Sequence, residues 1–207
     1  MACLLTASPG VGAKSMKDLL VSMPDEVMPC LNKNLRLEFV ELQEMGVKAE
    51  VKNLLGEVSV MDTLTQDFVQ VRMSKVSTLQ MKKLPMENGD SVLCVVKSFA
   101  GPEKESELYF FTQEWKVLDA SRFWGGKRIE DLAETLVQKP DTMSESRFAD
   151  LKAMIEPRMV SALLLQNENA LVVRLASPLL SVDDKKVVNV IKLQRKFNWS
   201  NGSFKDS

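Results

Sequence analysis

The hydrophobic pattern begins with two helical stretches. Ser15 is followed three residues later by Asp18, which has the form of a capping box, so we expect a short helix over 16–23. Asn32 or Asn34 can cap a second helix. The apolar face of that helix would carry the residues at helical spacing, which are Leu35, Phe39 and Leu42. The chain is therefore expected to open with two helices.

From residue 47 the hydrophobic period changes from the helical value to two. Alternating apolar and polar residues are typical of strands with one buried face. The predicted strands cover residues 47–52, 68–73, 78–84, 92–99 and 107–112. Asn88-Gly89 marks a tight hairpin turn, and Gly101-Pro102 marks another turn. Because connections this short permit antiparallel neighbours and not parallel crossovers, we expect an antiparallel meander.

The second half of the chain repeats this order of elements. A helix is expected over 129–137, and Thr142 with Glu145 has the form of another capping box for a helix that ends at Pro157. The strands expected after it cover residues 159–166, 170–176 and 187–199. The pattern therefore predicts an α+β fold, with N-terminal helices then an antiparallel meander, followed by a second helix-plus-antiparallel-sheet unit.

These elements divide the chain into three parts. Residues 1–13 precede the first helix, residues 14–120 form the first helix-plus-sheet unit, and residues 121–207 form the second. The pattern leaves open whether the two units pack as one domain or as two.

Residues 1–13 have the composition of the end of a secretory signal peptide. A short apolar run is broken at Ser8-Pro9-Gly10, and small residues follow, so cleavage is expected after Ala13. A disordered N-terminal tail is the alternative. The stretch 8–15 also looks like a phosphate-binding loop, but Ser8 and Ala13 stand where that motif needs glycine. We therefore reject nucleotide binding at this position.

Composition and charge narrow the classes of function. A chain that is 45% hydrophobic and 27% charged has the composition of a folded globular protein. Its net charge of −1 disfavours nucleic acid as a partner. No apolar run reaches the roughly 18 residues that a membrane-spanning helix requires, so we expect no membrane span.

The residue types of common catalytic sites are missing. The chain has no histidine, which removes the usual general base and metal ligand. Cys-x-x-Cys pairs and Ser-x-x-Lys dyads are also absent from the sequence. We therefore assign no catalytic residue, no metal and no cofactor. A carboxylate pair is the chemistry that remains, and its candidates are Asp183, Asp184, Glu103, Glu105 and Glu107.

Two cysteines lie after the expected cleavage position. Cys30 and Cys94 have apolar neighbours, so we expect both thiols to be buried. An oxidising compartment would permit a disulfide between them, and sequence leaves that open. Two N-glycosylation patterns, at Asn198 and Asn201, would matter only in a eukaryotic secretory pathway.

The connection between the two units has an unusual composition. Arg122, Phe123 and Trp124 are followed by two glycines and two more cations. Trp and Arg are enriched at binding hot spots, so these three residues are a candidate partner-binding site. Large aromatic residues also fill cores, so Phe123 and Trp124 could instead plug the seam between the two sheets. Both roles stay open at this point.

Three segments carry a resemblance to a known family. Residues 16–25, 139–144 and 193–199 resemble an uncharacterised family of exported proteins from Gram-negative gut anaerobes, known as a domain of unknown function. The resemblance implies export to the periplasm or the outer cell surface. It implies no activity and no catalytic residue.

Three hypotheses of function follow. The first is an exported, non-enzymatic binding or interaction module of the cell envelope, whose sheets present a face or an edge to a protein or peptide partner. The second is a hydrolase that acts through paired carboxylates. The third is an envelope structural protein that assembles through its own sheet edges. The sequence leaves the oligomeric state open.

Overall fold

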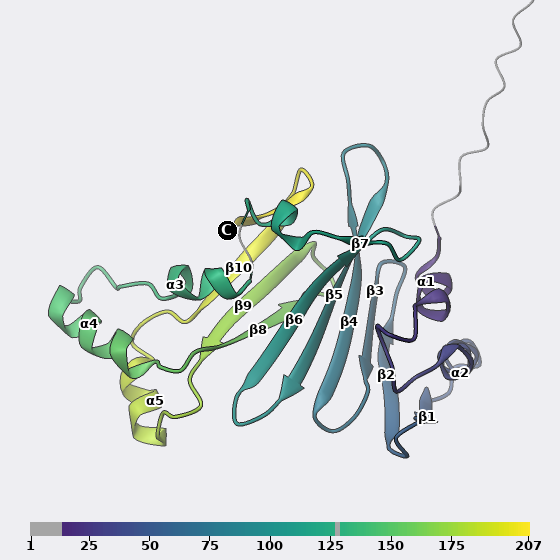
Figure 1. Cartoon of the computed structure of the whole chain (residues 1–207), viewed down its shortest axis with the longest axis horizontal. Helices are drawn as coiled ribbons and strands as arrows, with labels where there is room; N and C mark the ends of the chain where they lie inside the picture. Colours follow the sequence, from purple (N-terminus) through teal and green to yellow (C-terminus); the bar gives the residue numbers. More distant parts are fainter. Residues whose placement is uncertain (1–13, 127–128) are drawn as a thin grey trace, which may run out of the picture.

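The protein folds into two antiparallel sheets with helices packed around them. The computed structural model describes residues 14–126 and 129–207, so the predicted signal-peptide remnant, 1–13, lies outside the described residues. A seven-stranded sheet has the strand order β1-β2-β3-β4-β5-β6-β7, and a four-stranded sheet has the order β11-β10-β9-β8. Figure 1 shows α1 and α2 beside the β1–β3 end of the larger sheet, and α4 and α5 beyond the smaller sheet. The predicted α+β class, with helices, a meander and a second sheet unit, is confirmed.

The first part of the chain contains two helices and the larger sheet. The helices are α1 (Met16–Ser22) and α2 (Lys33–Glu44). The strands are β1 (Glu50–Lys52), β2 (Val58–Leu64), β3 (Phe68–Arg72), β4 (Ser77–Pro85), β5 (Ser91–Ala100), β6 (Lys104–Phe111) and β7 (Val117–Leu118). Each strand pairs with the next one along the chain, so the sheet is an uninterrupted meander.

The second part of the chain contains short helices and the smaller sheet. The helical segments are the 3₁₀ turns η1 (Ala120–Phe123) and η2 (Glu130–Leu132), and the helices α3 (Ala133–Leu136), α4 (Glu145–Met154) and α5 (Val182–Val188). The strands are β8 (Met159–Leu164), β9 (Ala170–Ala176), β10 (Gln194–Ser200) and β11 (Ser203–Asp206). Residues 120–123 thus begin the connection between the two sheets as a single 3₁₀ turn.

Local capping fixes both N-terminal helices. The capping box expected at Ser15 is present, with Asp18 N–H donating to Ser15 Oγ. Of the two candidates for α2, Asn32 is the cap, because its side chain accepts from the backbone of Leu35. The buried Arg36 then joins the two helices, since its guanidinium donates to the carbonyl oxygens of Met23 and Leu31.

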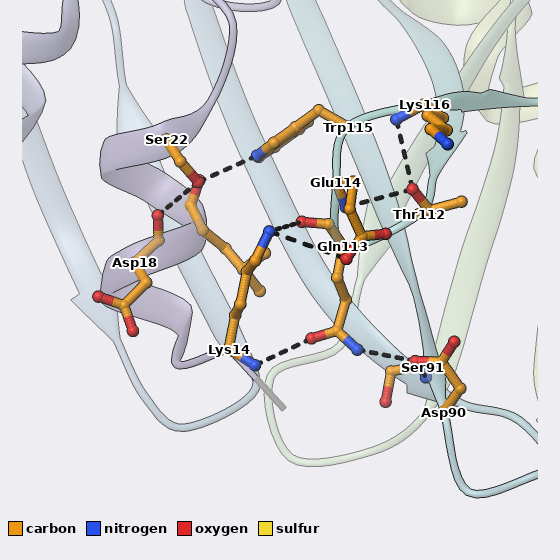
Figure 2. A network of polar contacts seen from close by, with 11 residues as sticks. Lys14, Asp18, Ser22, Asp90, Ser91, Thr112, Gln113, Glu114, Trp115 and Lys116 are labelled. Carbon is orange, nitrogen blue, oxygen red and sulfur yellow. Dashed lines mark hydrogen bonds and ion pairs between the residues drawn. The ribbon is translucent and has the colours of Figure 1, made fainter. Parts of the chain in front are cut away.

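A loop that follows β6 holds α1 against the larger sheet (Figure 2). The backbone N–H of Lys14 donates to Gln113 Oε1 (3.1 Å), and Lys14 Nζ donates to Gln113 O (2.9 Å). Trp115 Nε1 donates to Ser22 Oγ (3.4 Å). Both ends of the helix are therefore tied to one loop that lies more than 90 positions further along the chain.

The central part of the larger sheet is buried on both faces, and each face there belongs to a different hydrophobic core. In β5, Leu93 and Val95 face the core that α1 and α2 cover. Cys94 and Val96 face the other way, into a core shared with the smaller sheet. The alternation of side chains along a strand produces both faces from one segment. The core shared by the two sheets crosses the boundary expected at residue 120, and the division into domains stays a prediction.

The two thiols lie on opposite faces of this sheet. Cys94 is fully buried, as expected, whereas Cys30 is half-buried at the edge of the other core. Burial raises the pKa of both thiols above the ordinary value, and the effect is stronger for Cys94. Both are free cysteines, and the sheet between them explains why they are not joined.

Two sequence predictions in the second half were wrong in detail. The cap of α4 is Ser144, whose side chain accepts from Arg147 N–H, and not Thr142. Residues 187–199 are not one strand, because α5 covers Val182–Val188 and β10 starts only at Gln194. Ser181 caps α5, because its hydroxyl accepts from Asp184 N–H, and this cap starts a helix before a stretch whose alternating apolar residues had suggested a strand.

Three strands were not foreseen, namely β2, the two-residue β7 and β11. β2 carries a register irregularity between Met61 and Thr63, which interrupts its alternation of apolar and polar residues. β11 follows a two-residue hairpin at Asn201 and Gly202, both of which have positive φ. Asn-Gly is the usual sequence of such a turn, and the same two residues had been interpreted only as part of a glycosylation pattern.

β8 lies across one face of the larger sheet, where side chains bind its free edge. Ser106 Oγ accepts from Ala162 N–H (3.0 Å) and donates to Ala162 O (3.4 Å). Gln80 repeats this exchange with Leu164, at 2.9 Å to the N–H and 3.4 Å to the carbonyl oxygen. The buried Lys82 Nζ donates to Gln166 O (2.8 Å), just beyond the end of the strand. Side chains thus take the place of a neighbouring strand.

Aromatic side chains fill the space between the sheets on one side of β8. Phe123 stacks on Phe110 with ring centroids 4.3 Å apart. Trp124 stacks on Phe204 at 4.8 Å and meets Phe197 edge-on at 5.1 Å. Phe123 is 3% exposed and Trp124 is 6% exposed. The structure therefore places both aromatic residues in the seam between the sheets, which is the second of the two roles considered.

We expect Trp124→Ala to lower the free energy of unfolding by about 3–5 kcal/mol, because it leaves a cavity beside the rings of Phe197 and Phe204. Arg122→Ala, at the exposed neighbouring position, is the control, and it should change stability by less than about 0.5 kcal/mol. Urea denaturation of both variants measures the difference. Equal stability of the two variants would contradict the burial of Trp124.

We expect Ser106→Ala to destabilise the protein by about 1–3 kcal/mol, because it leaves the Ala162 N–H without its partner. Ser98→Ala is the matched control, since it removes a bond to Ser106 Oγ and leaves the bonds to β8 in place. Hydrogen exchange at the Ala162 amide should accelerate in the first variant only. Unchanged exchange in Ser106→Ala would show that the side chain does not hold β8.

Candidate functional site

β8 separates the covered face of the larger sheet into an apolar part and a polar part. On one side of β8 lie the aromatic seam and its core. On the other side is a hollow of about 430 Å³, which we call the intersheet trough. Its floor, on the larger sheet, is lined by Gln70, Arg72, Thr78, Gln80, Ser98 and Lys104. Its wall, on the smaller sheet, is lined by Ser161, Leu163, Val172, Arg174 and Gln194.

The floor of the trough follows from the alternation within three strands. In β3, Gln70 and Arg72 point away from the core formed by Val69 and Val71. In β4 and β5, Thr78 and Ser98 lie opposite each other in register. Uncharged hydroxyl and amide groups therefore stand side by side on neighbouring strands.

Hydrogen bonds position some of these floor groups and leave others with spare capacity. Gln80 Nε2 donates to Gln70 Oε1 (2.8 Å), and Ser98 Oγ bonds to Ser106 Oγ (2.8 Å). The Thr78 hydroxyl makes no side-chain hydrogen bond among the described residues. The floor can therefore both donate hydrogen bonds to a polar ligand and accept hydrogen bonds from it.

Some charged side chains of the trough form ion pairs, and others do not. Arg72 forms an ion pair with Asp62 (2.8 Å), and this carboxylate raises the pKa of Arg72. Glu103, which also lines the trough, pairs with Lys185 of α5. Lys104 and Arg174 are exposed and have no ion-pair partner within 14–126 and 129–207. The trough therefore carries an excess of positive charge on a chain whose net charge is −1.

A second hollow extends the trough past Arg174. It shares Arg174 and Gln194 with the trough, and it adds Asn189 and Lys192. Lys192 is exposed and also lacks an ion-pair partner in the described part of the chain. Three cations without an ion-pair partner in the described residues, Lys104, Arg174 and Lys192, thus line two hollows that share Arg174 and Gln194.

The carboxylates considered for catalysis have other partners. Asp184 caps α5 through Ser181, and Asp183 pairs with Lys186. Glu107 accepts from the hydroxyl of Tyr109, and Glu105 is exposed on β6. Among the described residues that line the trough, Glu103 is the one carboxylate. The structure does not bring a pair of these groups together in the trough.

The residues expected to bind a partner lie elsewhere. Arg122 is exposed, but Phe123 and Trp124 are buried in the aromatic seam on the other side of β8. Sequence reasoning missed the trough because it assigned the polar face of each strand to solvent. The sequence does contain a sign of the trough. The polar positions of β4 and β5 include the uncharged residues Thr78, Gln80 and Ser98, whereas exposed strands usually carry charged residues.

Within residues 14–126 and 129–207, no three His, Cys, Asp or Glu side chains gather as a metal site would require. None of the helices in the same residues has the length and apolar character needed to cross a membrane.

Comparisons with known proteins identify the family and leave the activity open. The chain is similar to a solved structure of a domain of an uncharacterized protein from Porphyromonas gingivalis W83, with 24% identity and a TM-score of 0.74. The similarity covers 94% of this chain and 100% of that one, and it supports the fold alone. No curated protein matches the chain. The family model described as "Protein of unknown function (DUF3256)" matches residues 8–204, and the chain therefore belongs to this family.

Proposed function

We propose that this chain is an exported, non-enzymatic binding module of the cell envelope, and that its ligand occupies the intersheet trough. The observation that carries the proposal is the unpaired positive charge of Lys104 and Arg174 beside a floor of uncharged hydrogen-bonding groups. Binding sites are concave and contain a few polar groups that fix the ligand. A trough of about 430 Å³ lies within the usual size of such sites.

The composition of the trough favours binding over hydrolysis. Hydrolysis through paired carboxylates requires two such groups on either side of the scissile bond. Glu103 is the one carboxylate among the described lining residues, and it is paired with Lys185. Hydroxyl and amide groups without an adjacent general base hold a ligand but do not activate a nucleophile.

Capture from envelope extract tests whether the trough is the binding site. We expect Thr78→Trp to fill the trough and to reduce the captured partner by about tenfold, because the added indole occupies space that the ligand needs. Glu87→Trp introduces the same side chain at an exposed turn outside the trough and should capture as the unmodified chain does. Thermal denaturation should show both variants folded. Capture that survives Thr78→Trp would place the binding site elsewhere.

Export is tested by the mass of the protein from its native cells. The composition of residues 1–13 supports cleavage after Ala13. We therefore expect a chain that starts at Lys14 and fractionates with the envelope. A cellular protein that retains Met1 would contradict export through this segment.

A further inference from the structure

We infer that the intersheet trough binds an extended, acidic peptide segment, and that the floor contacts the backbone of this segment through side chains. This inference rests on the proposed function and names the class of its ligand. It starts from the way in which the larger sheet already holds β8.

The floor binds one extended segment of the protein itself. Ser106 and Gln80 each exchange hydrogen bonds with the N–H and the carbonyl oxygen of one residue of β8. A short hydroxyl or amide side chain can do this because it both donates and accepts. The face of this sheet is therefore suited to hold a strand that lies across it.

The same kinds of groups continue beside β8 with no strand bound to them. Ser98 lies in register with Ser106 on the neighbouring strand, and Thr78 lies in register with Ser98. Gln70 lies in register with Gln80, and its amide already bonds to Gln80 and to Asp62. These groups line the trough, and the Thr78 hydroxyl has no partner among the described residues. A second extended segment can bind there as β8 binds beside it.

The opposite wall provides contacts for the side chains of such a segment. Leu163 and Val172 are paired across β8 and β9 and form an apolar surface, with Leu163 48% exposed. Arg174 lies two residues beyond Val172 on the same face of β9. An extended peptide that presents apolar and acidic side chains matches this arrangement.

The length of the depression matches a short peptide. The floor crosses from β3 to β6, which is about 14 Å at the usual spacing between strands. An extended chain covers that distance in roughly four residues. The second hollow, with Lys192, adds room for further residues.

Charge and lining chemistry distinguish a peptide from other anions. Lys104, Arg174 and Lys192 favour a negatively charged ligand. No aromatic residue lines either hollow among the described residues. Nucleic-acid bases and many sugars bind by stacking on aromatic rings, so the trough lacks the surface that they use.

Direct binding to two synthetic peptides tests the inference. The probes are a blocked hexapeptide of alternating glutamate and leucine and its lysine–leucine counterpart, measured by calorimetry with the full chain. We expect the acidic peptide to bind at least about tenfold more tightly than the basic one, and less tightly as salt is raised. Equal binding of both peptides, or tighter binding of an oligonucleotide of equal charge, would overturn the inference.

Variants localise the contact and test the contribution of the backbone. Arg174→Gln and Lys104→Gln should each weaken binding of the acidic peptide by about two- to fivefold. Arg147→Gln and Lys33→Gln remove exposed cations from α4 and α2 and should leave binding unchanged. The same peptide methylated at alternate backbone nitrogens should bind more weakly, since methylation removes the N–H donors. Trough variants that behave as their controls do, or a methylated peptide that binds equally well, would overturn the inference.

The two proposals fail in different ways. If the acidic peptide does not bind while capture from extract still depends on Thr78, the trough remains the binding site and the peptide class is wrong. If Thr78→Trp leaves capture unchanged, the proposed function itself is wrong.

Discussion

The arrangement of the two sheets depends on how the free edge of β8 is satisfied. A strand at the edge of a sheet presents unpaired backbone groups, and burying them without partners costs free energy. In this protein the partners are Ser106 and Gln80, which project from the face of the larger sheet. They fix the smaller sheet across that face and so define both the core on one side of β8 and the trough on the other. Both features follow from a few side-chain hydrogen bonds.

The face under β8 changes character along its strands. At one end, Leu84, Val92 and Cys94 pack into the shared core. At the other end, the same face carries Thr78 and Ser98, and it stays polar because no apolar layer covers it. A strand that alternates regularly can thus have a core residue and a binding residue on one side, separated by only a few positions.

Local signals predicted much of the fold, whereas contacts over long separations could not be predicted. The caps at Ser15 and Asn32 and the meander itself depend on residues close in sequence, and these predictions were confirmed. The cap at Ser181 is equally local, but the alternating apolar residues after Val187 were given more weight, and the helix was missed. The bonds from Ser106 and Gln80 to β8 join residues 56 and 84 positions apart. No periodicity in the sequence specifies such a pairing, so neither the position of β8 nor the trough could be derived from the sequence.

Residues 122–124, first considered as a partner-binding site, affect the shape of the trough through the packing of the two sheets. Phe123 and Trp124 fill the space on one side of β8, against Phe110 and Phe204. Alternate residues of β8 face the core and the trough. Leu164 belongs to the aromatic core, and Leu163 belongs to the wall of the trough. Because a protein core is close-packed, a change in the volume of its side chains shifts the strands that pack against it. The volume of these aromatic side chains therefore helps to set how far the smaller sheet stands from the floor, and hence the width of the space that Arg174 and Thr78 line.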